Sequence, residues 1–227
     1  MPLKRRGFSL LEMILSTLML GLLTGMLFLA FRDGTRAFNN LNLRQGLEGE
    51  ARRCSNVLEQ QLRQSDLSCC EAINTPSRQR LGVSGATVSR DGVSYVTLSN
   101  WWDSTLFSSQ GRPQWNQYEV IYATLYNPGQ LVRQIYRPPG SPYQMSLPGF
   151  TALAMLNDDP ADNTAARETH ILSKSVEDFQ IAVDGSQASL DIRLILTDRQ
   201  PLRAGSNRAS QERLQMDLTL KMNNTQP

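Results

Sequence analysis

Apolar and polar positions divide the chain into stretches of different period, and the first is almost wholly apolar. Residues 13–31 form a run of nineteen residues without a charged side chain. A helix needs about 20 apolar residues to cross about 30 Å of hydrocarbon, so this run predicts a membrane-spanning helix. Lys4, Arg5 and Arg6 precede it, and basic residues favour the cytoplasmic side of a membrane. We therefore expect a cytoplasmic N-terminus and an extracytoplasmic body.

The second stretch, residues 32–66, repeats apolar positions mostly at three- and four-residue steps. These positions are Phe38, Leu41, Leu47, Ala51, Cys54, Leu58 and Leu62. The spacing predicts an amphipathic helix that continues the first. A break is expected, if anywhere, at Gly34 or between Gly46 and Gly49, because each Gly costs up to about 1 kcal/mol relative to Ala. An unbroken helix over residues 8–64 would be about 85 Å long.

From Leu81 onward the apolar period is two, which is typical of strands. We expect strands at residues 93–98, 115–125, 131–136, 176–183, 190–196 and 214–220. Asp91-Gly92 and Asp184-Gly185 predict hairpin turns, and Asn127-Pro128-Gly129-Gln130 predicts a type II turn. Five prolines in residues 137–165 predict a long loop, with one helical turn near residues 151–156, and residues 198–210 predict a polar loop.

These elements together predict an α+β fold. A long N-terminal α-helix, membrane-spanning in its first half and amphipathic in its second, would pack on an antiparallel β-sheet domain of hairpins. We expect one face of that sheet to be apolar and the other to face water.

One acidic residue does not fit a simple membrane anchor. Glu12 lies immediately before the apolar run and four residues after Phe8. A carboxylate at the centre of a membrane helix costs at least about 2.5 kcal/mol, so a chain keeps one mainly where it meets a partner. Cleavage between Gly7 and Phe8 would create such a partner, the cationic α-amino group of Phe8. The acid of one subunit could then pair with the amine of the next.

At these residues the chain resembles the type IV prepilin family, which includes the pseudopilins of type II secretion and competence systems. The family motif is a short basic leader, a Gly, a cleavage point, a Phe that becomes N-methylated, and an acid as the fifth mature residue. Gly7, Phe8 and Glu12 match those positions. Many members carry a Pro within the apolar helix, whereas this chain has Gly21 and Gly25 there.

The resemblance implies a leader peptide at residues 1–7, a transmembrane and assembly helix at 8–31, its amphipathic continuation at 32–66, and an extracytoplasmic β-rich domain at 67–227. The order of elements also resembles the larger minor pilins, the PilW-like and GspJ-like group, and residues 171–179 resemble the segment before their C-terminal hairpin. A minor pilin or pseudopilin is implied, with a place at or near the tip of a pilus or of a secretion or competence pseudopilus.

The partners implied are other pilins or pseudopilins, prepilin peptidase, the inner-membrane assembly platform and the membrane. The implied location is a single pass through the inner membrane with a periplasmic domain, and the fibre after assembly.

A secretory signal and a plain membrane anchor stay open as alternatives for the N-terminus. A cleavable secretory signal has an apolar core of about 7–15 residues and a small-residue cleavage site, and the run here is longer, without a convincing site. A plain anchor would make the chain a single-span extracytoplasmic binding domain with no fibre role, but it leaves Glu12 unexplained.

Charge and motifs point away from nucleic-acid binding and catalysis. Without Lys4, Arg5 and Arg6 the chain has 20 basic and 21 acidic residues, so no overall positive field attracts nucleic acid. His170 is the only histidine, and no nucleophile, zinc or phosphate-binding motif accompanies it. We expect no enzyme, no catalytic residue and no cofactor.

Three further groups have both a functional and a structural interpretation. Cys54, Cys69 and Cys70 form no metal-binding spacing. One disulfide could form among them in an oxidising compartment and would leave one thiol over, and Cys54 is expected to pack as a small apolar residue. The oxygen-rich loop Asn157, Asp158, Asp159, Asp162 and Asn163 could bind calcium or be a solvated turn; we predict no metal. Trp101, Trp102, Trp115, Tyr118, Tyr122, Tyr126 and Tyr136 lie among Arg112, Arg133 and Arg137. They could form a platform for single-stranded nucleic acid, but packing with Val120 along a strand is favoured.

Overall fold

The fold is known from a computed structural model that describes residues 9–66, 69–82, 85–137, 156–184, 189–201 and 209–221. Two compact units divide the chain, residues 1–43 and 44–227. A single α-helix, α1 (Leu10–Arg63), contributes to both units, and the strands belong to the second.

Helix α1 contains 54 residues and has no break at any of its glycines. Of the two possibilities that the sequence leaves open, a break at Gly34 or between Gly46 and Gly49 does not occur, and the helix is continuous from Leu10 to Arg63. A Cβ added at any of these three glycines would meet nothing within 4 Å, so they are not places of close packing. Helix propagation is cooperative, and isolated glycines, each costing about 1 kcal/mol, do not interrupt it here.

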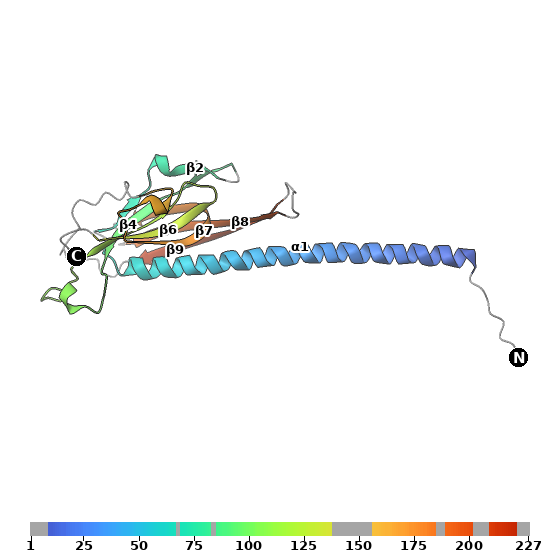
Figure 1. Ribbon diagram of the computed structural model, residues 1–227, viewed down its shortest axis with the longest axis horizontal. Helices are drawn as coiled ribbons and strands as arrows, with labels where there is room; N and C mark the ends of the chain where they lie inside the picture. Colours follow the sequence, from blue (N-terminus) through green and yellow to red (C-terminus); the bar gives the residue numbers. More distant parts are fainter. Residues whose placement is uncertain are drawn as a thin grey trace. The chain divides into compact units, whose positions relative to one another are not determined.

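The main sheet is antiparallel and has seven strands in the order β1-β4-β5-β6-β7-β8-β9, and Figure 1 shows how it curls. The strands are β1 (Glu71–Ile73), β4 (Gly92–Thr97), β5 (Gln117–Ala123), β6 (Gly129–Tyr136), β7 (Glu168–Asp184), β8 (Ser189–Pro201) and β9 (Ala209–Lys221). A second sheet pairs β2 (Gln79–Leu81) with β3 (Thr87–Ser89). Short 3-10 helices occupy Pro76–Arg78, Ser104–Leu106 and Pro160–Asp162. The α+β prediction is confirmed.

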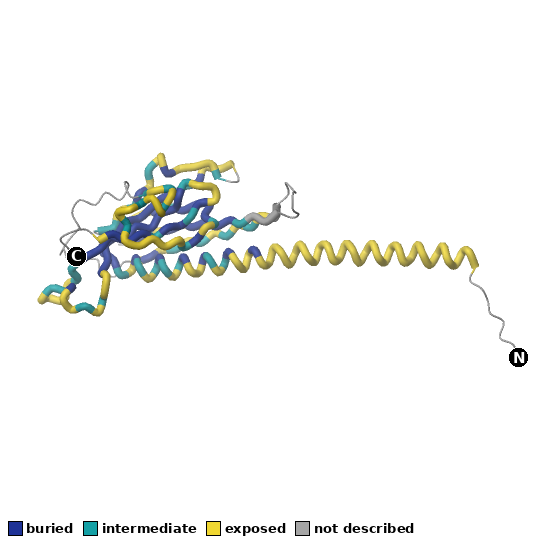
Figure 2. Tube along the Cα trace, in the orientation of Figure 1, coloured by how far each residue is buried: buried dark blue, intermediate teal, exposed yellow. Residues whose placement is uncertain are grey.

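One core of the second unit lies between the C-terminal part of α1 and the sheet. The predicted helix face is buried there, at Leu47, Ala51, Cys54, Leu58 and Leu62, against residues of β4 to β9. Figure 2 shows the change from exposed to buried positions along α1. Phe38 and Leu41, expected on the same face, belong to the first unit and are 63% and 58% exposed, so that part of the prediction is wrong.

A second core covers the other face of β4, β5 and β6. Every residue of β4 and β5 is buried, so the expectation of one wet sheet face is wrong for these strands. The segment between β4 and β5 supplies Leu98, Leu106 and Trp115, which pack on Tyr118, Val120 and Tyr122 of β5. Local alternation could not reveal this, because the covering residues come from a connecting segment. On β9 the alternation holds, with Leu214, Met216 and Leu218 less exposed than their neighbours.

Asp91 and Gly92 do not form the predicted hairpin turn. The Asp91 N–H donates to the carbonyl of Phe179 at 2.9 Å, and its carboxylate accepts from the N–H of Ile181 at 3.1 Å. Asp91 is thus a buried link from β3 to the sheet, and β4 begins at Gly92.

The hairpin of β5 and β6 is confirmed, but its turn is not type II. The Asn127–Pro128 bond is cis, and Gly129 lacks the positive φ that a type II turn requires at that position. The expected loop at 198–210 is too long, because β8 continues to Pro201 and β9 begins at Ala209. Gly185 and residues 138–155, with most of the proline-rich loop and of the expected helical turn, lie outside the described residues.

Candidate functional site

The N-terminal half of α1 presents an unburied apolar surface. All residues from Leu10 to Phe31 are exposed, and the leucine, methionine, isoleucine and phenylalanine side chains among them are 48–79% exposed. Within the described residues, α1 is the one helix long and apolar enough to cross a membrane. Apolar surface of this extent marks contact with a membrane or with another protein.

The hydroxyl groups of the two threonines within this segment donate to carbonyls of the helix itself. The Thr17 hydroxyl donates to the carbonyl of Met13 at 2.9 Å, and the Thr24 hydroxyl donates to the carbonyl of Leu20 at 2.8 Å. A segment in hydrocarbon has no water for such groups, so internal hydrogen bonds are required. Both threonine hydroxyls are therefore compatible with a lipid environment.

Glu12 lies in the first turn of α1 and forms a reciprocal pair with Ser9. The Ser9 N–H donates to Oε2 of Glu12 at 3.0 Å, and the Glu12 N–H donates to Oγ of Ser9 at 3.2 Å. This is a capping box, in which two N–H groups without intrahelical partners are satisfied. Gly7 and Phe8, the other predicted processing residues, lie outside the described residues.

Ser9 is a helix-capping residue that the sequence prediction does not include. The spacing Ser9-Leu-Leu-Glu12 matches the S-x-x-E signature of a capping box before an apolar run, and this signal could have found it. The sequence predicts Glu12 only as a partner for a cation, whereas the structure shows that it also holds the helix start. The negative charge of the Glu12 carboxylate also interacts favourably with the positive end of the helix dipole.

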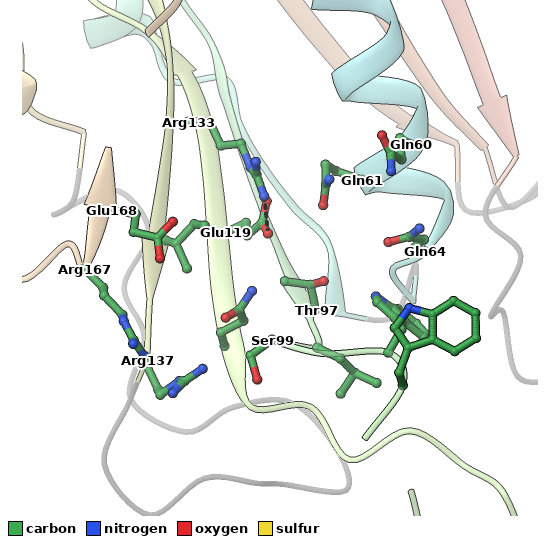
Figure 3. Close-up of a pocket in the computed structure, with 15 residues that line it drawn as sticks. Gln60, Gln61, Gln64, Thr97, Ser99, Glu119, Arg133, Arg137, Arg167 and Glu168 are labelled. Atoms are coloured by element: carbon green, nitrogen blue, oxygen red, sulfur yellow. Dashed lines mark hydrogen bonds and ion pairs between the residues drawn. The ribbon is translucent and has the colours of Figure 1, made fainter. Parts of the chain in front are cut away.

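A separate polar pocket of about 670 Å³ opens on the second unit. The end of α1, the end of β4, strands β5 and β6, and the start of β7 all contribute to its lining. Figure 3 shows Gln60 and Gln61 of α1 across from Glu119 and Arg133 of the sheet. No sequence pattern indicates this pocket, because its lining residues are up to about a hundred positions apart.

An ion pair of β5 and β6 lies in the wall of this pocket. Arg133 donates from Nε and Nη2 to the two oxygens of Glu119 at 2.6 and 2.7 Å, and the Tyr95 hydroxyl donates to Glu119 at 2.7 Å. Glu119 is 1% exposed. Burial and the neighbouring carboxylate of Glu119 raise the pKa of Tyr95 well above its ordinary value, so the phenol stays a donor and fixes the carboxylate.

Two more arginines line one end of the pocket, where β6 ends and β7 begins. Arg137 directly follows β6, Arg167 directly precedes β7, and both are exposed. The Arg167 N–H donates to the carbonyl of Ile135 at 2.8 Å, so Arg167 lies beside the end of β6. In Figure 3 the Arg167 side chain extends toward Arg137. Glu168 is near them but pairs with His170 at 3.4 Å. His170 is exposed and lies within β7.

The three cysteines carry no disulfide in the structure. Cys54 packs in the core as the sequence predicts, and burial, the largest cause, raises its pKa to about 12. Burial likewise raises the pKa of Cys70 to about 12. Cys54 and Cys70 are therefore neutral thiols at ordinary pH.

The oxygen-rich loop uses its side chains in local hydrogen bonds. Asp158 accepts from the N–H of Leu125 at 2.7 Å, Asp159 caps a 3-10 helix by accepting from the N–H of Ala161 at 3.1 Å, and the Asn163 amide donates to Gln134 at 3.1 Å. Within the described ranges, no three His, Cys, Asp or Glu side chains are placed to hold a metal ion.

Most of the aromatic residues that could have formed a nucleic-acid platform pack inside the domain. Trp115, Tyr118, Tyr122 and Tyr136 are buried in the second core, which confirms the packing interpretation for them. Trp102 differs, because it is 93% exposed and lines the polar pocket.

The chain matches no protein-family model, no curated protein and no solved structure.

Proposed function

We propose that this chain is a minor type IV pilin-like subunit, a pseudopilin in the broad sense, which is inserted in the inner membrane and assembles through its N-terminal helix. The exposed apolar surface of α1 from Leu10 to Phe31 carries the proposal. A helix that is apolar on all sides must be covered by lipid or by other helices. An assembling subunit uses both, first the membrane and then the helices of its neighbours.

Glu12 supplies the second argument. Cleavage after Gly7 leaves the amide between Phe8 and Ser9 intact, so the capping box of Ser9 and Glu12 can persist in the mature chain. The new amine of Phe8 would stand beside the positive end of the helix dipole, which disfavours a cation there. A carboxylate at Glu12, from the same or a neighbouring subunit, offsets that cost and sets the axial position of one helix against the next.

Mass spectrometry of the N-terminus tests the proposal. Protein purified from membranes of the native host should begin with N-methylated Phe8, and a Gly7→Ala variant should retain its leader because the residue before the cut is changed. A functional wild-type chain that still begins at Met1 would refute the assembly role. The same measurement then supports the other candidate, a single-span anchored binding domain, which the polar pocket favours. The pilus, secretion or competence system that the subunit serves is decided by its partner pilins.

A further inference from the structure

The side chains that line the polar pocket match a ligand that both donates and accepts many hydrogen bonds. Small-molecule pockets are mostly apolar with a few polar groups, whereas amide, guanidinium and carboxylate side chains dominate this lining. Gln60 and Gln61 contribute two amides from the end of α1, and Gln64 lines the pocket directly after it. A glutamine amide carries two N–H donors and an accepting oxygen. Ligand hydroxyl groups, which also donate and accept, match such a wall.

Trp102 adds an apolar platform at this polar surface. Its neighbour Trp101 packs edge-on against Trp115, with ring centroids 6.1 Å apart. Trp102 instead donates its backbone N–H to Asn100 Oδ1 at 3.0 Å and is itself 93% exposed. An open indole face offers a large flat apolar area, and the C–H face of a sugar ring is flat and apolar as well.

Arg137 and Arg167 give the pocket a positive end. Arg133 is already paired with Glu119, and Glu168 lies 3.4 Å from the ring of His170. Among the ion pairs of the described residues, none includes Arg137 or Arg167. Planar guanidinium groups bind carboxylates through two parallel hydrogen bonds, so this end suits a ligand that carries carboxylates.

We propose that the pocket binds an acidic oligosaccharide built of carboxylate-bearing sugar rings. One ring stacks on Trp102, its hydroxyls bond to the glutamine amides, and carboxylates bind Arg137 and Arg167. A volume of about 670 Å³ lies within the range of roughly 300–1,000 Å³ that ligand pockets span. Such a ligand would let the extracytoplasmic domain attach to an acidic polysaccharide.

Single-stranded nucleic acid shares the stacking and the positive charge but fits less well. Nucleic-acid platforms combine successive stacking rings with a positively charged groove that tracks the backbone. Here Trp102 is the strongly exposed ring of the described lining. One ring offers stacking to a single base and not to a row of successive bases.

Calorimetry on the full chain in non-ionic detergent tests the proposal with three probes: tetragalacturonate, its methyl ester, and a short oligothymidylate. We expect tetragalacturonate to bind, its uncharged ester to bind at least about tenfold more weakly, and oligothymidylate to bind more weakly than tetragalacturonate. Arg137→Ala and Arg167→Ala should each weaken tetragalacturonate binding about tenfold, and Trp102→Ala about fivefold.

Arg112→Ala is the matched control, because Arg112 is exposed but does not line the pocket. The Arg112→Ala variant should bind tetragalacturonate with the same affinity as the unaltered chain. No binding of tetragalacturonate, equal binding of the ester, tighter binding of oligothymidylate, or an equal loss in the control would each overturn the proposal. None of these results depends on cleavage after Gly7, so the assembly function is tested separately.

Discussion

Substitutions at Glu12 and Ser9 can separate the helix-capping role that the structure shows from the charge pairing that we propose for the same carboxylate. Glu12 accepts a hydrogen bond from the Ser9 N–H at 3.0 Å, and in an assembled fibre it would also pair with the amine of Phe8. Gln can replace Glu in a capping box, so Glu12→Gln keeps the cap and removes the charge. Ser9→Ala removes the accepting Oγ and keeps the charge.

The two roles predict losses of fibre incorporation of different size. Two unit charges about 4 Å apart attract by about 4 kcal/mol at an effective dielectric constant of 20, which corresponds to roughly a thousandfold in an equilibrium constant. Loss of a Ser cap costs about 1 kcal/mol. If charge pairing fixes the subunit in the fibre, Glu12→Gln should nearly abolish incorporation, whereas Ser9→Ala should reduce it by less than about tenfold.

The assay is immunoblotting of sheared fibres against total membrane protein, with N-terminal mass spectrometry to show that both variants are still cleaved. Glu12→Ala, which removes cap and charge together, should be at least as defective as Glu12→Gln. Wild-type incorporation of a cleaved Glu12→Gln variant would refute the charge-pairing argument and leave Glu12 as a helix cap only.

Two further predictions concern the second unit. A Cβ at Gly129 would lie 2.8 Å from the carbonyl oxygen of Thr124 and would collide with Arg90, so Gly129→Ala should lower the free energy of unfolding by about 1–3 kcal/mol in urea titrations. Gly46→Ala, with nothing within 4 Å of its Cβ, should raise the free energy of unfolding by up to about 1 kcal/mol. The same change in the free energy of unfolding for both variants would contradict the packing argument. The Cys54 pKa rises from 9.0 to about 12 on folding. The neutral Cys54 thiol therefore contributes fully to the free energy of unfolding below pH 9. This contribution is lost as pH rises toward 12, by up to about 1.4 kcal/mol per pH unit. Compared with Cys54→Ala, the unaltered chain should therefore lose stability faster over that range, and parallel curves would count against the burial of this thiol.

Local periodicity is a reliable guide where one side of an element faces a uniform environment. The apolar run of residues 13–31 is helical throughout, and the alternation of Leu214, Met216 and Leu218 matches β9. The run is predicted from its length and lack of charge, whereas on β9 the two-residue repeat of the backbone decides which side chains share a face. The helix face at Leu47, Ala51 and Leu58 follows from the same rule.

Features made by contacts between distant segments were not predictable from the sequence. Asp91 resembles a turn residue, yet Phe179 and Ile181, about ninety positions away, hold it inside the domain. Arg78 and Arg90 are 5% and 2% exposed, although arginine is almost never fully buried unless it is paired. Their donors reach backbone carbonyls that only the folded chain places within range.

The sequence by itself determined the apolar helix, the position of its one acid and the α+β class, because each depends on the order and spacing of neighbouring residues. Only the tertiary structure decided which sheet faces are covered and that Trp102, Arg137, Arg167 and three glutamines line one pocket. The pairing of strands and the packing of connecting segments bring the pocket and core groups together across long stretches of chain, and no local pattern records such contacts.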